Sequence, residues 1–208
     1  MGALPDPPLL LITDRMQAKR ALEQVAQAAC LGGGRWISLR EKDLPVGEQI
    51  ALVMRIKQIA GPLGARVLIH GTADLAAQAG ADGVHLKTDG DARTARERLG
   101  PQALIGQSIH DVGEAGRADP GMLDYVVAGP AFPTRSKPGY GPALETEGLH
   151  RLVSASRVPV LALGGIDAHT LLMCRAAGVA GVAVMGGVMR APDPCLEMRM
   201  LVQAWNQS

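Results

Sequence analysis

The feature that most constrains the fold is a repeated unit in which a short apolar run is followed by a helical segment. The apolar runs lie at residues 9–13, 36–40, 66–70, 83–86, 104–108, 125–128, 158–163 and 181–185. Four helical segments follow the first four runs, at about residues 18–31, 47–60, 73–79 and 92–99. The fifth ends at residue 117, the sixth begins at residue 144, the seventh begins at residue 168, and the last spans about residues 194–205. Short apolar runs joined by helices are typical of a parallel sheet with right-handed crossovers. Eight such units predict a TIM (β/α)8 barrel.

A weak internal repeat agrees with this fold. Residues 79–84 (AGADGV) resemble residues 177–182 (AGVAGV), and in both segments a helix ends in glycine before a new strand. An open doubly wound sheet is the alternative, but it requires some of the runs not to be strands. The first run is also not followed by the G-x-G-x-x-G pattern of a dinucleotide site. We therefore expect one barrel domain over residues 1–208.

Composition excludes several classes of protein. Lys and Arg (21) nearly balance Asp and Glu (20), and only 2% of the residues are aromatic, so nucleic-acid binding is not expected. Cys30, Cys174 and Cys195 are far apart and in no CxxC spacing, which argues against disulfides and a zinc knuckle. No apolar run is long enough for a membrane span and no signal peptide is evident. These features predict a cytoplasmic protein that does not bind membranes.

Glycine pairs follow the last two predicted strands. Gly164-Gly165 and Gly186-Gly187 each precede a helix, where unpaired N–H groups and the helix dipole favour an anion. Barrel enzymes place their sites at the carboxyl ends of the strands and often bind phosphate after the last two. An ordinary turn is the alternative reading of a glycine pair. Two pairs at these positions favour a phosphate monoester ligand, with Met185 beside the second pair.

The loop after residues 125–128 has a composition suited to phosphate oxygens. Thr134, Arg135, Ser136 and Lys137 bring two hydroxyl groups and two cations within four residues. Taken alone, such a loop is more often simply solvated. Its position at the carboxyl end of a predicted strand favours a binding role.

Two cations follow the second predicted strand. Arg40 and Lys42 alternate along the chain and therefore share a face, so that with Lys137 they could form a second anion subsite. A solvated, charged strand end explains them equally well.

Three histidines end the third, fourth and fifth predicted strands, where an imidazole can transfer protons near neutral pH. His110 follows Ser108 and precedes a helix, which makes it the best acid-base candidate. His85 lies between Val84 and Leu86 and could be a structural group. A zinc site on His70, His85 and His110 is an alternative, but no fourth ligand is evident, so no metal is expected.

Taken together, these residues resemble the thiamine phosphate synthase superfamily, which includes the thiazole tautomerases of TenI type. The resemblance covers nearly the whole chain. It rests on the segments ITD (12–14), LREK (39–42), DLA (74–76), GADGVHL (80–86), GQSIH (106–110), GPAFPT (129–134) with Lys137, LGGI (163–166) and VAVM (182–185).

The segments that carry magnesium in the synthases differ here. Synthases of this superfamily hold the ion with an aspartate that follows an asparagine after the third strand and with another aspartate after the fourth. The first position reads His70-Gly71, the second falls on Gly90, and Ser38 replaces a glutamine that contacts diphosphate. Only Asp89 or Asp91 could substitute. The resemblance therefore favours the tautomerase branch.

A tautomerase converts an exocyclic-alkene tautomer of a carboxythiazole phosphate into the aromatic thiazole without metal or cofactor. By resemblance, His110 would move the proton, the two glycine pairs would bind phosphate, and Arg40 with Lys42 would face the carboxylate. His70 stands where both branches usually carry an asparagine, so it could be a second proton-transfer group or could signal a different substrate. The remaining substrate-binding candidates are Ser108, Thr134, Ser136, Lys137 and Met185. The resemblance also implies a homodimer.

Three other functions remain open from the sequence. One is a thiamine phosphate synthase, which joins a pyrimidine diphosphate to a thiazole phosphate, with an altered magnesium site. Another is a barrel that binds a thiamine-pathway phosphate without turnover. The last is a metal hydrolase built on the three histidines.

Overall fold

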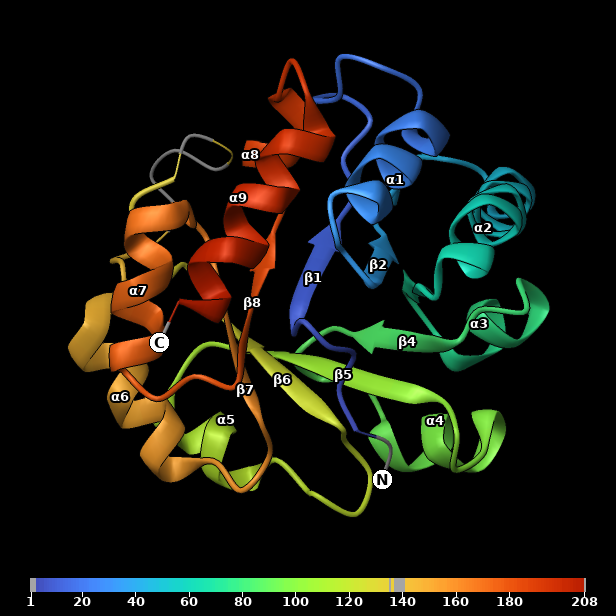
Figure 1. Ribbon diagram of the computed structural model, residues 1–208. Helices are drawn as coiled ribbons and strands as arrows, with labels where there is room; N and C mark the ends of the chain where they lie inside the picture. The colour runs from blue at the N-terminus through green and yellow to red at the C-terminus, as the bar shows by residue number, and fades with distance from the viewer. Residues whose placement is uncertain (1–2, 135, 137–140, 208) are drawn as a thin grey trace.

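The chain forms a closed barrel of eight parallel strands that follow one another around the ring in sequence order (Figure 1). The computed structural model describes residues 3–134, 136 and 141–207. The strands are β1 (Leu9–Ile12), β2 (Trp36–Leu39), β3 (Arg66–His70), β4 (Gly83–Leu86), β5 (Leu104–Ile109), β6 (Tyr125–Ala128), β7 (Val160–Leu163) and β8 (Gly181–Val184). Parallel pairing of Leu10 with Ala183 joins β1 to β8 and closes the ring. The predicted TIM barrel is confirmed, and the open-sheet alternative is wrong.

Helices cover the outside of the barrel (Figure 1). They are α1 (Leu22–Leu31), α2 (Val46–Ala60) with the short 3-10 helix η1 (Gly61–Leu63), α3 (Ala73–Gln78), α4 (Ala92–Leu99), α5 (Val112–Arg117), α6 (Glu145–Ala155), α7 (Ala168–Ala176), α8 (Gly186–Arg190) and α9 (Pro194–Asn206). The first helix begins at Leu22, four residues later than about residue 18, the start expected from the sequence. The five-residue helix α8 was not expected, because so short a segment carries no readable periodicity.

The strands are buried on both faces, which explains why they read as continuous apolar runs. On β2, Ile37 and Leu39 pack outward against the helices, whereas Trp36 packs inside the barrel with Tyr125. The two rings meet edge to face, with centroids 4.6 Å apart. Gly106 makes room for them, because a Cβ there would overlap the Tyr125 ring. Large side chains therefore fill the middle of the barrel, and polar groups are left at the carboxyl ends of the strands.

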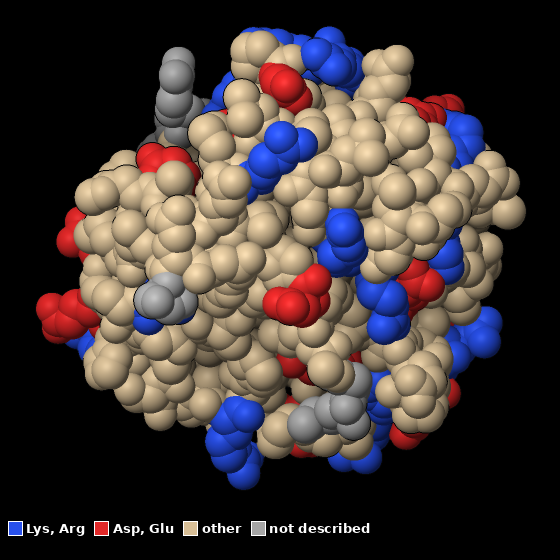
Figure 2. Space-filling view, in the orientation of Figure 1, with Lys and Arg blue, Asp and Glu red and all other residues tan. Residues whose placement is uncertain are grey.

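The surface shown in Figure 2 carries positive and negative side chains scattered among uncharged ones. Within the described part of the chain, no helix is long and apolar enough to cross a membrane.

Candidate active site

A cavity of about 900 Å³ opens at the carboxyl ends of the strands. Every strand contributes to its wall, either with its last residues or with the loop that follows. The predicted site residues that line it are Arg40, Lys42, His70, Ser108, His110, Thr134, Ser136, Gly164, Gly165, Met185, Gly186 and Gly187. Lys137 and Arg135 lie outside the described residues. The fold thus brings the described candidates together, while their individual roles remain predictions.

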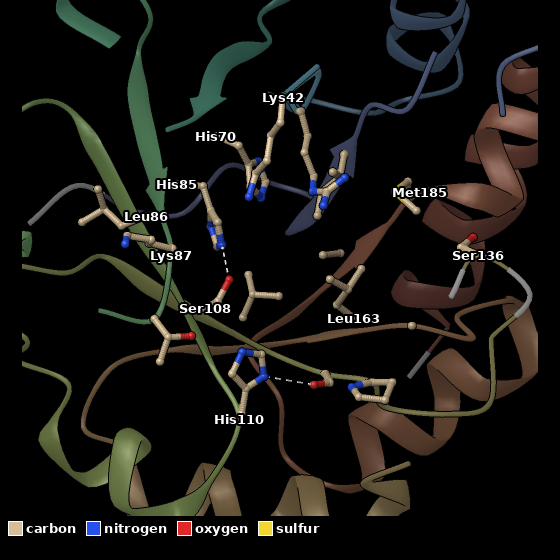
Figure 3. Close-up of a pocket in the computed structure, with 18 of the residues that line it drawn as sticks. Lys42, His70, His85, Leu86, Lys87, Ser108, His110, Ser136, Leu163 and Met185 are labelled. Carbon is tan, nitrogen blue, oxygen red and sulfur yellow. Dashed lines mark hydrogen bonds between the residues drawn. The ribbon is translucent and has the colours of Figure 1, made fainter. Parts of the chain in front are cut away.

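His85 is buried beneath the cavity floor, with 2% of its surface exposed. Its Nδ1 lies 3.2 Å from the Tyr125 hydroxyl, and its Nε2 lies 3.0 Å from the Ser108 hydroxyl (Figure 3). Burial, together with the smaller effects of the Lys42 and Arg40 charges, lowers the pKa of His85 to about 3. The imidazole is therefore neutral at pH 7, and its burial with both ring nitrogens hydrogen-bonded is what a structural histidine requires.

His70 is the last residue of β3 and is half-buried at the cavity wall. Its ring lies over that of His85, with centroids 4.3 Å apart, and its Nδ1 lies 2.9 Å from the Ser38 hydroxyl. Two of the positions at which the chain departs from the synthase pattern are thus hydrogen-bonded neighbours on β2 and β3. His70 is larger than the asparagine of the synthase pattern, and Ser38, which it contacts, is smaller than the glutamine of that pattern.

His110 follows β5 and is exposed in the cavity. Its backbone N–H donates to the Glu114 carboxylate at 2.6 Å, and its Nδ1 lies 3.5 Å from the Gly129 carbonyl oxygen. In Figure 3, Lys42 and His70 lie near the top of the view and His110 near the bottom. An exposed imidazole can exchange protons with solvent or ligand, as general acid-base catalysis requires.

The end of β8 forms a pocket wall rich in hydrogen-bond donors. Helix α8 begins directly at Gly186, and its N-cap residue, Met185, provides no side-chain hydrogen bond to the first turn. The sequence predicts the helix after this glycine pair at about residues 194–205, whereas α8 begins at the pair itself. A Cβ on Gly186 would overlap both the Ser136 hydroxyl and the Arg190 guanidinium group, so glycine lets these two groups approach the helix start.

Arg190, the last residue of α8, joins two separate loops to this helix. Its Nη1 donates to the Gln17 side-chain oxygen and to the Ser136 hydroxyl, the latter at 3.2 Å. The Ser136 hydroxyl in turn donates to the Gln17 oxygen at 3.1 Å. Sequence reasoning missed Arg190 and Gln17. The only available signal for Arg190 was a cation four residues after a glycine, which has no meaning until α8 is known to be a helix.

The first glycine pair differs from expectation. Gly164 and Gly165 have φ values of +106° and +65°, and α7 begins only at Ala168. The first-turn N–H groups of His169 and Thr170 are already bound by the Asp167 carboxylate, at 2.9 and 2.8 Å. The expectation of unpaired helix N–H groups at this pair is therefore wrong. The pair instead makes a left-handed turn, in which a Cβ on Gly165 would lie 2.7 Å from the Pro133 carbonyl oxygen.

Arg40 and Lys42 both line the cavity, as their alternation along the chain predicts. Glu41 between them is buried and accepts hydrogen bonds from the Thr13 hydroxyl at 2.7 Å and the Arg15 backbone N–H at 3.2 Å. Neither Arg40 nor Lys42 forms an ion pair with a described carboxylate. Burial lowers the pKa of Lys42, and the neighbouring charges of Arg40 and Lys87 also lower it.

Three carboxylates on the cavity wall, those of Asp74, Asp89 and Asp91, are each bound to a neighbouring group. Asp89 is paired with Lys87 at 3.1 Å, and Asp91 accepts both the backbone N–H and the hydroxyl of Thr94. Asp74 is paired with Arg98 at 3.0 Å. The described residues contain no group of three His, Cys, Asp or Glu side chains that could hold a metal ion.

The zinc alternative fails on the same grounds. His85 uses both ring nitrogens for Tyr125 and Ser108, and the three histidines do not converge. The hypothesis of a metal hydrolase built on these histidines is therefore wrong for the described residues.

Comparison with known proteins identifies the family to which the chain belongs. The family model for thiamine monophosphate synthase matches residues 9–188. A putative thiamine-phosphate synthase of Geobacter sulfurreducens is 42% identical over 196 residues, which cover 93% of this chain and 92% of that protein. The thiamine-phosphate synthase of Myxococcus xanthus is 35% identical, with 98% and 94% coverage.

Among solved structures, thiamine phosphate pyrophosphorylase from Pyrococcus furiosus superposes with a TM-score of 0.83 at 30% identity. The superposition covers 96% of this chain and 95% of that chain. The relatives carry synthase names, so the comparisons do not support the tautomerase branch that the resemblance favoured. The chain belongs to the thiamine monophosphate synthase family.

Proposed function

We propose that this chain is a transferase of thiamine biosynthesis that joins a pyrimidine diphosphate to a thiazole phosphate. The observation that carries the proposal is a single cavity with two separate groups of anion-binding side chains. One group, Arg40 and Lys42, follows β2. The other, Ser136 and Arg190, lies at the start of α8. Two anionic substrates could therefore bind side by side.

The size of the cavity and the names of the relatives support this assignment. A volume of about 900 Å³ lies at the upper end of the range for small-molecule sites. In the joining reaction, the bond between the pyrimidine part and its diphosphate breaks and a bond to the thiazole phosphate forms. The diphosphate leaves with the electron pair of the broken bond, so cations near it stabilise the developing charge. Arg40 and Lys42 are suited to that end of the cavity, and Ser136 with Arg190 to the phosphate of the thiazole.

A thiazole tautomerase is the second candidate, and a specific observation favours it. The residues at the positions of the synthase magnesium ligands, Gly71 and Gly90, carry no carboxylate, whereas His110 is exposed in the cavity. A carboxythiazole phosphate would place its phosphate and carboxylate on the same two groups of donors. Proton transfer by His110, with His70 as a second candidate, would then complete the reaction without metal.

One pair of assays separates these functions. Purified protein is incubated with the pyrimidine diphosphate and the thiazole phosphate, and thiamine phosphate is measured by mass spectrometry. In parallel, the carboxythiazole phosphate tautomer is followed by ultraviolet absorbance, using the native chain and His110→Ala. Formation of thiamine phosphate is the expected result. Tautomer conversion that is lost in His110→Ala, with no thiamine phosphate, would replace this proposal by the second candidate.

A barrel that only binds a pathway phosphate remains distinguishable from both enzymes. It would show ligand-dependent thermal stabilisation with no conversion in either assay. The homodimer implied by the resemblance also remains a proposal. Apolar side chains such as Leu172 on α7 and Leu196 on α9 are exposed and are candidates for such an interface. The molar mass in solution tests it.

A further inference from the structure

We propose that the end of the cavity above β2 and β4 binds a diphosphate group directly, through Arg40, Lys42 and Lys87, without a divalent metal ion. This inference rests on the proposed function for its ligand class. It departs from the metal-dependent chemistry that membership of the family implies, and three observations carry it.

The first observation is a group of three cations, two of which form no ion pair with a described carboxylate. Arg40 and Lys42 line the cavity, and neither forms an ion pair with a described carboxylate. Lys87 lines the same wall from the end of β4. The three charges are close enough that Arg40 and Lys87 lower the pKa of Lys42, in addition to the effect of its burial. Like charges held together at a cavity wall are a binding site for a multiply charged anion.

The second observation concerns Lys87, whose partner in the structure is weakly held. Its ammonium group lies 3.1 Å from the Asp89 carboxylate, and both side chains are more than 70% exposed (73% and 74%). Exposed pairs of this kind contribute little to stability, so replacement of the Asp89 carboxylate by a phosphate oxygen as the partner of Lys87 costs little free energy. Lys87 can therefore add a third positive charge to the site when a diphosphate enters.

The third observation is that both positions of the synthase magnesium ligands lack a carboxylate, and that Gly90 leaves no room for one. A Cβ on Gly90 would lie 2.8 Å from the Leu86 Cβ and 3.1 Å from the Lys87 carbonyl oxygen. An aspartate there would require the backbone to move. At Gly71, a Cβ would lie 3.0 Å from the Leu75 side chain. The two positions that hold magnesium in the synthases are thus glycines here, while three cations, Arg40, Lys42 and Lys87, line the same wall.

The direct test uses inorganic pyrophosphate as the probe and isothermal titration calorimetry as the measurement. We expect the native chain to bind pyrophosphate with EDTA present, and added Mg²⁺ not to increase the affinity. Binding that occurs only with Mg²⁺ would overturn the inference.

Charge-removing variants locate the site. We expect Arg40→Gln and Lys42→Gln each to weaken pyrophosphate binding about tenfold, as for a lost charge-assisted hydrogen bond. Lys87→Gln, at an exposed position that does not affect folding, should weaken it by about two- to fivefold. Arg151→Gln, on the outer helix α6 and 65% exposed in its side chain, is the matched control and should bind like the native chain. Unchanged affinity in all three cavity variants would also overturn the inference.

The outcome is separable from that of the proposed function. Metal-free pyrophosphate binding without formation of thiamine phosphate would leave this subsite standing and refute the transferase. Formation of thiamine phosphate with strictly Mg²⁺-dependent pyrophosphate binding would do the reverse.

Discussion

At the scale of single residues, the cavity combines groups of the same type in very different environments. His85 is buried and neutral, with Tyr125 and Ser108 on its two ring nitrogens, while His110, at the end of the next strand, is exposed. Burial removes the proton affinity of the first histidine and leaves the second available for chemistry. A test of His85 therefore measures stability as a function of pH, whereas a test of His110 measures activity.

Burial of His85 predicts a loss of stability in mild acid. The pKa of His85 in the folded state is about 3, below the ordinary value of 6.5, so below pH 6.5 the unfolded chain binds a proton that the folded chain does not. The stability of the fold with a neutral His85 is fully present above pH 6.5, and the free energy of unfolding decreases as the pH falls from 6.5 towards 3. The slope should be up to about 1.4 kcal/mol per pH unit.

The measurement is urea unfolding at several values between pH 7 and pH 4. His85→Gln removes this part of the slope, although the variant itself should be less stable at pH 7. His150→Gln, at an exposed position on α6, should keep the native pH dependence. If His85→Gln and the native chain show parallel stability curves, the assignment of the slope to His85 fails.

Arg190 predicts an effect on phosphate binding rather than on folding. Its guanidinium group lies over the start of α8, within reach of a phosphate held there, together with the Ser136 hydroxyl. We expect Arg190→Gln to weaken binding of inorganic phosphate about tenfold in a calorimetric titration. Arg199→Gln on α9, whose guanidinium group contacts only Cys195 of its own helix among the described partners, is the control. Equal affinity in the two variants would exclude Arg190 from the site.

At the scale of elements, ion pairs fasten the outer helices to the barrel. Arg96 on α4 donates to the Asp124 carboxylate at 2.6 Å and to the carbonyl oxygens of Ala103 and Met122. The same Asp124 oxygen accepts the Ile105 backbone N–H at 2.8 Å. Helix α4, strand β5 and the start of β6 are thus joined through one buried carboxylate.

Removal of Arg96 should therefore destabilise the whole barrel. Arg96→Met leaves the Asp124 charge buried without its partner, at a cost of about 3–5 kcal/mol of unfolding free energy. On the same helix, Arg98 is paired with Asp74 at the surface, so Arg98→Met should cost no more than about 1 kcal/mol. Urea unfolding of both variants makes the comparison, and a similar loss in the two would show that the buried pair is not special.

At the scale of the whole molecule, closure of the barrel decides where the chemistry can occur. Strand β8 pairs with β1, so residues from the two ends of the chain meet, and Gln17 contacts Arg190 across the loops that follow these strands. The middle of the barrel is filled by Trp36 and Tyr125, for which Gly106 leaves the space. A ligand can therefore bind only above this layer, at the carboxyl ends.

Much of this arrangement could be predicted from residues near one another in the sequence. Strands of a parallel barrel are buried on both faces and therefore appear in the sequence as short apolar runs. The alternation of these runs with helices predicted the number and order of the strands. Parallel strands in one ring then place all their carboxyl ends together, so Arg40, His70, His110 and Gly186 could be assigned to one site from sequence alone. The same segments carry the resemblance to the thiamine phosphate synthase superfamily, and membership of that family is confirmed.

Only the tertiary structure decided how the site residues are paired. Asp167 binds the first-turn N–H groups of His169 and Thr170 on α7. Arg190 on α8 donates to Gln17 in the loop that follows the neighbouring strand β1. These outcomes depend on the distance between side chains from distant parts of the chain, which local periodicity does not encode. The same holds for Arg40 and Lys42. Their positive charge and their spacing are known from the sequence, but only the folded structure shows that they form no ion pair with a described carboxylate.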